Sequence, residues 1–186
     1  MESLEKQIIT WIKQDAYRME ALQLVSQLQL RDWCLGAGFV RNLVWDRLHQ
    51  YQENTPLNDI DVVYFDPNNS SSDADINYEQ QLCALSSHPW SVKNQARMHL
   101  RHGHAPYSGT AEAISHWVEI ETAVGAKLNT AGEIELVAPL GIESLFNFTI
   151  SHNSRHSQPW ILRERALNKG WLTRWPRLQI AELNSN

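Results

Sequence analysis

The sequence predicts an α+β domain in which helices pack against a mixed β-sheet. The chain has 186 residues, a length that favours one domain with one hydrophobic core. Residues 58–66 are rich in β-branched and aromatic side chains between turn residues, which indicates a strand. Residues 33–51 contain a short apolar run, a glycine turn and then apolar residues at helical spacing, which indicates a strand followed by a helix.

The N-terminal residues predict two scaffold helices. Residues 3–14 place Ile8 and other apolar side chains on one face, and Ser3 is a suitable N-cap. A second helix is expected over residues 16–28, where Leu22 belongs to an apolar repeat at helical spacing. That apolar face should pack on the sheet.

A glycine turn follows the strand predicted at residues 33–35. Gly36, Ala37 and Gly38 open directly into the next predicted helix. Glycine lets a backbone come close to a ligand, and the free amides at a helix start attract anions such as phosphate. The turn is therefore a candidate phosphate site, although an ordinary connection between a strand and a helix has the same pattern.

Two carboxylates stand at the start of the strand predicted at residues 58–66. Asp59 and Asp61 should point to the same side, because successive strand side chains alternate faces. Like charges held this close repel unless a cation or water lies between them. Carboxylate oxygens favour Mg²⁺ or Mn²⁺, and Mg²⁺ is often bound by one or two carboxylates together with substrate phosphates. The alternative is a pair of ordinary surface acids.

Hydrogen-bond donors gather after a strand predicted at residues 90–92. Lys93 and Arg97 are candidates for binding phosphate, and Asn94 for binding a base or sugar. The alternatives are structural, with Arg97 paired to an acid and Asn94 capping the helix that follows. His99, with two further histidines close behind it, raises the possibility of a zinc site, but the sequence offers no fourth ligand at a suitable spacing.

Residues 117–128 alternate apolar with polar or small side chains and predict a strand, which residues 133–137 should join as a hairpin. Glu119 and Glu121 would then share a face. Toward the C-terminus, residues 160–169 predict a helix with several cations, and the tryptophans that follow it should close the core. We therefore expect a single domain over residues 1–186, with N-terminal helices (1–30), a catalytic core (31–150) and a C-terminal helical segment (151–186).

The run from Gly36 to Asn42, followed by Asp59, Ile60 and Asp61, resembles the signature of the DNA polymerase β nucleotidyltransferase superfamily, nearest in style to CCA-adding enzymes. From Gly36 to about residue 177 the chain more closely resembles a bacterial nucleotidyltransferase-like family of unknown substrate. That family shares Arg-Asn-x-x-Trp, Asn-Asp-x-Asp-Val, Val-Lys-Asn-Gln-Ala-Arg and Ala-Pro-x-Gly segments in this order. The resemblance implies a polymerase β-like nucleotidyltransferase fold.

The resemblance also implies a reaction, the Mg²⁺- or Mn²⁺-dependent transfer of a nucleoside monophosphate from an NTP to an unidentified hydroxyl acceptor. Asp59, Asp61 and Glu119 are then the expected catalytic residues and metal ligands, with Glu121 as the other candidate for the third acid. The expected nucleotide-binding residues are Gly36, Ala37, Gly38, Arg41, Lys93, Asn94 and Arg97. Two departures weaken any inference about the donor: Ala37 stands where many members have Ser or Gly, and Asn42 replaces a frequent acid.

Composition limits the classes of partner. With 16 Lys and Arg against 21 Asp and Glu, the net charge is −5, which argues against a protein that grips long nucleic acid by its phosphates. The sequence lacks an apolar run of the length that a membrane span needs and a signal-peptide pattern, so a cytoplasmic protein is expected. The other hypothesis to retain is a noncatalytic nucleotide-binding or partner-binding module that keeps the fold and has lost transfer.

Overall fold

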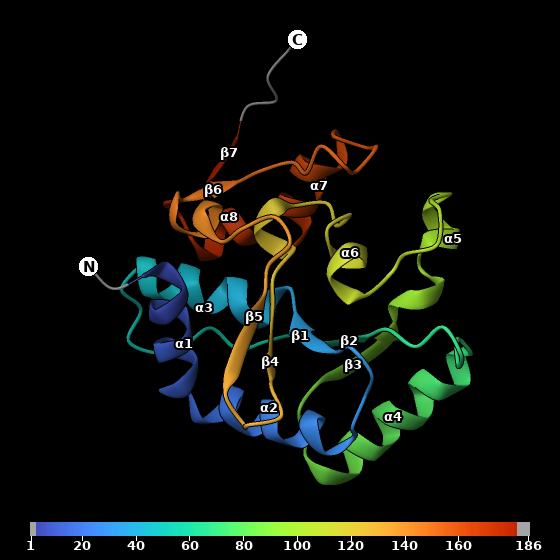
Figure 1. Ribbon diagram of the computed structural model, residues 1–186. Helices are drawn as coiled ribbons and strands as arrows, with labels where there is room; N and C mark the ends of the chain where they lie inside the picture. Colours follow the sequence, from blue (N-terminus) through green and yellow to red (C-terminus); the bar gives the residue numbers. More distant parts are fainter. Residues whose placement is uncertain (1–2, 182–186) are drawn as a thin grey trace.

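The central element of the computed structural model, which describes residues 3–181, is a sheet with the strand order β3-β2-β1-β4-β5 (Figure 1). Strands β2 and β3 run parallel, and the other neighbours run antiparallel, so the prediction of a mixed sheet is confirmed. A separate parallel pair, β6 with β7, was not predicted. The strand bounds are β1 Cys34–Gly36, β2 Ile60–Tyr64, β3 Trp90–Asn94, β4 Gly125–Leu128, β5 Ile134–Val137, β6 Thr149–Ile150 and β7 Gln179–Ile180.

The helices begin close to where the sequence predicts. Ser3 caps α1 by accepting a hydrogen bond from the Lys6 amide. Nowhere in residues 3–181 is a helix long and apolar enough to cross a membrane. The α-helix bounds are α1 Leu4–Lys13, α2 Ala16–Gln27, α3 Gly38–Leu48, α4 Ser72–Leu85, α5 His99–His102, α6 Thr110–Ile114, α7 Ile161–Asn168 and α8 Trp171–Arg174.

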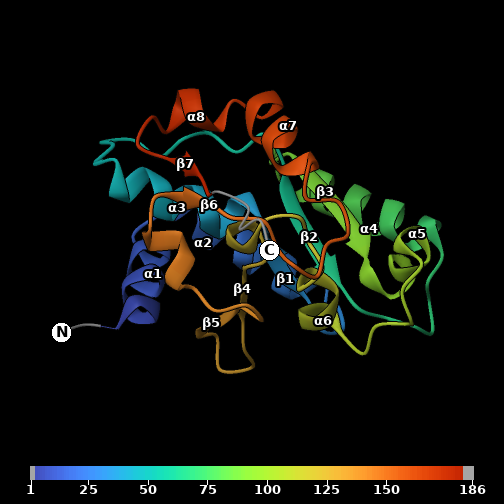
Figure 2. The ribbon, with the colours of Figure 1, turned by 90° about the horizontal axis from the view of Figure 1, so that it is seen from above.

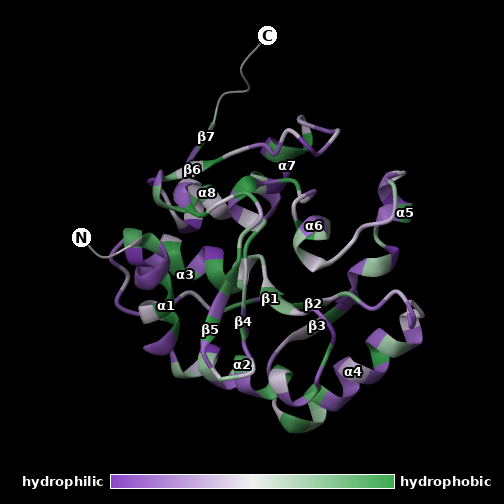
Figure 3. Cartoon of the chain, in the orientation of Figure 1, coloured by the Kyte–Doolittle hydropathy of each residue, from purple (hydrophilic) through white to green (hydrophobic). Residues whose placement is uncertain are grey.

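The two faces of the sheet have different roles. Leu35, Val62 and Val92 point into the main core, to which α1 to α4 also contribute buried residues. Cys34 and Val63, their neighbours along the chain, point to the other face, where Ile114 and α6 cover part of it. In Figure 1, α2 and α4 lie below the sheet and α6, α7 and α8 above it; Figure 2 shows the same layers from above. Hydrophobic and hydrophilic residues alternate along the outer helices (Figure 3), as expected for helices that bury one side.

The C-terminal segment is fixed to α3 by a second, smaller core. Trp45 of α3 lies edge-to-face against Trp171 and Trp175, and all three side chains are buried. The Trp175 indole N–H donates to the buried carboxylate of Asp46 at 2.8 Å. The predicted role of these tryptophans in closing the core is confirmed, and their packing sets α7 and α8 beside the start of α3. Residues 182–186 of the predicted C-terminal segment lie outside the described residues.

The strand predicted at residues 117–128 is wrong over its first eight residues. Only Gly125–Leu128 pairs in the sheet as β4, while Ile120–Thr122 forms a 3₁₀ turn and Glu119 makes an isolated bridge to His152. The hairpin with β5 is confirmed. The alternation of apolar and polar residues misled the prediction because buried residues line both sides of this segment, so that Glu119 and Glu121 are themselves fully buried.

Candidate functional site

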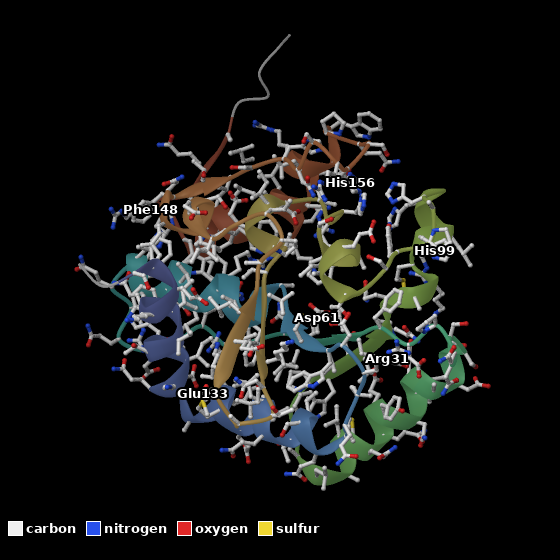
Figure 4. All side chains as sticks on the ribbon, in the orientation of Figure 1. Arg31, Asp61, His99, Glu133, Phe148 and His156 are labelled. Atoms are coloured by element: carbon white, nitrogen blue, oxygen red, sulfur yellow. The ribbon has the colours of Figure 1, made fainter. Side chains whose placement is uncertain are left out.

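Asp59 and Asp61 lie at the beginning of β2. Asp61 lies opposite Gly36 of β1 and beside Ser91 of β3. Because alternate strand residues share a face, Asp61 points to the same side as Val63, away from the main core. Asp59 precedes the strand by one residue and is exposed. In Figure 4, Asp61 is labelled near the centre of the molecule, below the loop that carries His156.

A polar cleft of about 100 Å³ opens beside this pair. Four parts of the chain form its walls: the start of α3, the loop into β2 with the start of that strand, the turn at Thr122, and the helices α7 and α8. The structure thus brings the glycine turn and the paired carboxylates to one place. The lining residues include Ala37, Gly38, Arg41, Asn42, Asp59, Asp61, Thr122, Arg165, Lys169, Trp171 and Arg174.

The turn between β1 and α3 has an unusual backbone. Ala37 has φ 54° and ψ −119°, values that a residue with a Cβ rarely adopts and that cost on the order of 1–3 kcal/mol. No side chain caps the first turn of α3, so the free amides of this 11-residue helix are available to an anion in the cleft. Gly36 is required for packing, because a Cβ there would lie 2.9 Å from the ring of Trp117.

Arg41 forms a fixed positive charge in the cleft wall. Its Nη1 donates to Thr122 Oγ1 at 2.6 Å, and its Nε and Nη2 both donate to Asn42 Oδ1. The guanidinium lies over the ring of Trp171, with 4.3 Å from Cζ to the ring centroid. Burial lowers the pKa of Arg41 to about 10, which leaves it charged at neutral pH. The neutral side chain of Asn42 orients Arg41 without neutralising it.

Three further cations come from the C-terminal segment: Arg165 and Lys169 at α7, and Arg174 of α8. The sequence prediction noted the cations of the helix at 160–169 but did not assign them to the site. The spacing of four between Arg165 and Lys169 places them on one helix face, and this was the available signal. Which way that face points depends on the tryptophan packing against α3, which no local pattern reveals.

The ionised form of Asp61 is disfavoured in this cleft. Burial, and after it the charge of Asp59, raise the pKa of Asp61 to about 6, although Arg41 and Lys169 act in the opposite direction. The protein therefore compensates the charge of the ionised carboxylate only in part. A bound cation that replaced the proton would supply the rest.

Glu119, the predicted third acid, is placed differently. Its Oε1 accepts a hydrogen bond from Arg165 Nε at 2.6 Å in an ion pair, and the carboxylate is buried. It is not among the residues that line the cleft. Glu121 is also buried: its Oε2 accepts from the Ser151 amide at 2.8 Å, and burial raises its pKa to about 7. The structure thus brings neither glutamate to the aspartate pair.

The donors at the end of β3 and just after it divide into two groups. Lys93 is exposed and borders a second pocket that it shares with Asp61. Asn94 is buried and caps the following turn, since its Oδ1 accepts from Ala96 and Asp66 amides and its Nδ2 donates to two carbonyls. Arg97 pairs with the buried carboxylate of Asp75. The observed contacts of Asn94 and Arg97 are therefore those of the structural alternatives: Asn94 caps a turn, and Arg97 is paired with an acid.

The fit of a metal ion can be judged from these positions. Within residues 3–181, no three His, Cys, Asp or Glu side chains are grouped to hold a metal, so neither the histidines after His99 nor three carboxylates form a ready ligand set. Asp59 and Asp61 fit a Mg²⁺ or Mn²⁺ ion whose remaining ligands are water and phosphate oxygens. The raised pKa of Asp61 agrees with such a two-carboxylate site.

Solved structures show what this arrangement resembles. One described as a CCA-adding enzyme head domain matches with a TM-score of 0.82 and 29% identity over 96% of each chain. A CCA-adding enzyme in complex with CTP matches with a TM-score of 0.58 and 12% identity over 97% of this chain and 44% of that chain. A tRNA-processing enzyme complex matches with a TM-score of 0.54 and 16% identity over 87% and 43%. This chain thus spans less than half of the latter two.

No curated protein matches the chain significantly. A family model described as nucleotidyltransferase matches residues 23–180, which include the glycine turn, the aspartate pair and the cations of the cleft. Together with the structural likeness to a CCA-adding enzyme head domain, this confirms the predicted polymerase β-like fold. The chain belongs to this nucleotidyltransferase family.

Proposed function

We propose that the protein transfers a nucleoside monophosphate from an NTP to a hydroxyl acceptor, with a Mg²⁺ or Mn²⁺ ion bound by Asp59 and Asp61. One observation carries the proposal. The aspartate pair opens into the same cleft as the uncapped start of α3 and the cations Arg165 and Lys169. A divalent ion would compensate the negative charge of the aspartates, and a triphosphate would compensate the positive charge of the cations.

The acidic and the basic residues of the cleft have different roles in this proposal. Asp59 and Asp61 would provide anionic oxygen ligands for the ion, and phosphate oxygens and water would provide the others. The amides at the start of α3 and the fixed guanidinium of Arg41 face the phosphates from one wall, and Lys169 faces them from another. A bound CTP in a structurally similar CCA-adding enzyme supports the choice of an NTP as donor.

The reaction is an in-line displacement at phosphorus. The acceptor hydroxyl oxygen forms a bond to the α-phosphorus, the bond between that phosphorus and the bridging oxygen to the β-phosphorus breaks, and pyrophosphate leaves while the hydroxyl proton passes to solvent. When bound, the divalent ion offsets the negative charge that develops on the phosphate oxygens. The cations around the cleft hold the leaving pyrophosphate in line with the attacking oxygen.

Glu119 has a positioning role in this proposal instead of the predicted role as a metal ligand. Its ion pair holds Arg165 at the cleft wall. A conformational change that released Glu119 toward Asp61 would first have to break that pair, leaving a buried carboxylate without a partner.

A noncatalytic nucleotide-binding module is the second candidate. It is favoured by the same ion pair, because Glu119 is engaged with Arg165 and leaves the aspartates as a two-carboxylate site. The two candidates differ in turnover alone: the module would bind an NTP with a divalent ion and release it unchanged.

The test is a comparison of melting temperatures with each of the four NTPs, with and without Mg²⁺, followed by incubation of labelled NTP with a cell extract. The proposal expects a stabilising shift that needs the ion, and label transferred to a component of the extract. Equal shifts with and without the ion would contradict the two-aspartate site. Ion-dependent binding without transfer in extracts would favour the module.

A further inference from the structure

A second pocket meets the cleft at Asp61. Its volume is about 290 Å³, nearly three times that of the cleft. Asp61 lines both, and the other walls are distinct: the cleft lies toward the start of β2, whereas Val63 and Lys93 place the second pocket further along the strands. The carboxylate of Asp61 therefore stands between two separate spaces.

Phosphoryl transfer needs one space for the leaving pyrophosphate and another for the acceptor, and the cleft and the second pocket can provide them. The attacking and leaving oxygens must lie on opposite sides of the phosphorus. If the pyrophosphate occupies the cleft with its cations, the α-phosphorus lies near Asp61, and the acceptor hydroxyl must approach from the other side. The second pocket, which shares only Asp61 with the cleft, is a candidate for that approach. Its volume of about 290 Å³ is on the scale of a small-molecule site.

The walls of the second pocket are rich in hydrogen-bond donors. Lys93 and Arg101 contribute positive charge, and Asp61 is the only carboxylate among its described lining residues. His102 and His116 add imidazoles, and Nδ1 of His116 is buried without a hydrogen-bond partner among the described residues. Once a divalent ion offsets the charge of Asp61, this pocket is an anion-binding site.

We propose that the second pocket binds the acceptor and that this acceptor is a small molecule carrying a phosphate group. The inference rests on the proposed transferase function and names the substrate class of that site. The phosphate would contact Lys93 and Arg101, while the acceptor hydroxyl would lie beside Asp61.

A phosphate group matches these donors better than a neutral acceptor does. Phosphate accepts several charge-assisted hydrogen bonds at once, and Lys and Arg are its usual partners. Burial lowers the pKa values of His102 and His116, and neighbouring imidazoles lower them further. Neutral imidazoles can still donate one hydrogen bond each. The stacked rings of Tyr107 and His116, 5.2 Å apart, form a flat wall for the rest of the molecule.

The experiment is a calorimetric titration of the full chain with ribose 5-phosphate, inorganic phosphate and ribose. Each probe is added to the free protein and to protein preloaded with Mg²⁺ and a nonhydrolysable NTP analogue. We expect ribose 5-phosphate to bind the loaded protein at least tenfold more tightly than ribose, and inorganic phosphate to bind more weakly at the same site. Lys93→Met and Arg101→Met should each weaken ribose 5-phosphate binding about tenfold.

Lys127→Met is the matched control, because Lys127 lies on β4 in an ion pair with Glu135 outside both pockets; it should bind like the parent protein. Three results would overturn the inference: no binding of either phosphate probe, unchanged binding by both pocket variants, or competition between ribose 5-phosphate and the NTP analogue. Failure of the NTP analogue to bind with Mg²⁺ would refute the proposed transferase function, while titration of the Asp61→Asn protein, in which that carboxylate charge is removed, would still test the phosphate pocket.

Discussion

Asp59 with Asp61, and Glu119 with Glu121, are two pairs of acids with the same spacing and opposite environments. The aspartates face a cleft with cations on its far wall, and Asp59 is exposed. Both glutamates are fully buried; one is paired with Arg165, and the other accepts a backbone hydrogen bond and has its pKa raised to about 7 by burial.

The difference shows how a fold separates a binding site from a structural one. Like charges two residues apart must be compensated in either case. For the glutamates the protein provides the compensation, by an ion pair and by a shift toward the protonated form. The pKa of Asp61 is raised as well, but Asp61 lines an open cleft, so a ligand cation can reach its carboxylate and replace the proton. Four substitutions can break or sharpen this contrast.

The largest effect is expected from Asp61→Asn. Loss of an anionic ligand should reduce cation-dependent NTP binding and transfer by about 1,000-fold. Because the substitution removes one of two repelling charges, the metal-free protein should melt at the same temperature or higher. Melting curves in chelator, together with NTP titrations in Mg²⁺, measure both effects.

Asp66→Asn is the control for Asp61→Asn, because Asp66 follows the other end of β2 and lies outside the cleft. It should leave NTP binding unchanged. A destabilised Asp61→Asn protein with intact cation binding would show that Asp61 is a structural acceptor.

Glu121→Gln should change the dependence of stability on pH. The pKa of Glu121 rises from 4.5 to about 7 on folding. Because Glu121 therefore ionises at lower pH in the unfolded chain than in the folded protein, the free energy of unfolding falls as the pH rises through this range. From pH 5 to pH 8, the stability of the variant relative to the parent should therefore increase by up to about 3 kcal/mol. Urea denaturation at the two pH values measures this. A difference that is independent of pH would mean that Glu121 is ionised in the fold.

Glu119→Gln should destabilise the protein by about 2 kcal/mol, the usual scale for a hydrogen bond to a charged group. Arg165 would lose its partner and with it a fixed position at the cleft, so NTP affinity should fall severalfold while its dependence on Mg²⁺ remains. Urea denaturation and NTP titration measure these effects, with the exposed Glu133→Gln as control. Unchanged stability would contradict the observed ion pair.

The smallest effect is expected from Lys169→Met. One cation of several should contribute about 1.4 kcal/mol, or tenfold in NTP affinity. Arg163→Met, on the same helix but not among the cleft residues, is the matched control. Equal affinities for the two variants would remove Lys169 from the phosphate site.

Local patterns predicted most of the fold. Ser3 as a cap, the strand after Asp59, the turn at Gly36 and the β4 to β5 hairpin each depend on residues near in sequence. The prediction failed around Glu119. Apolar and polar residues alternate there as in a strand, but the residues on both sides are buried and the segment forms a 3₁₀ turn.

The site was only partly predictable for the same reason. The sequence indicated the turn and the aspartates because each is a local motif. It did not assign Arg165, Lys169 and Arg174 to the cleft, because their positions follow from tryptophan packing between α3 and the C-terminal segment. It also grouped Asn94 and Arg97 with Lys93, although long-range contacts with Asp66 and Asp75 engage both of them.

The most direct test of the central claim, that the two aspartates and neither glutamate hold the ion, is a Mn²⁺ titration. Binding to the parent, Asp61→Asn and Glu119→Gln proteins can be followed by electron paramagnetic resonance of the free ion, in the presence of a nonhydrolysable NTP analogue. We predict that Asp61→Asn loses Mn²⁺ binding and that Glu119→Gln keeps an affinity within a few-fold of the parent. A loss in Glu119→Gln as large as that in Asp61→Asn would contradict the account and make Glu119 the third ligand.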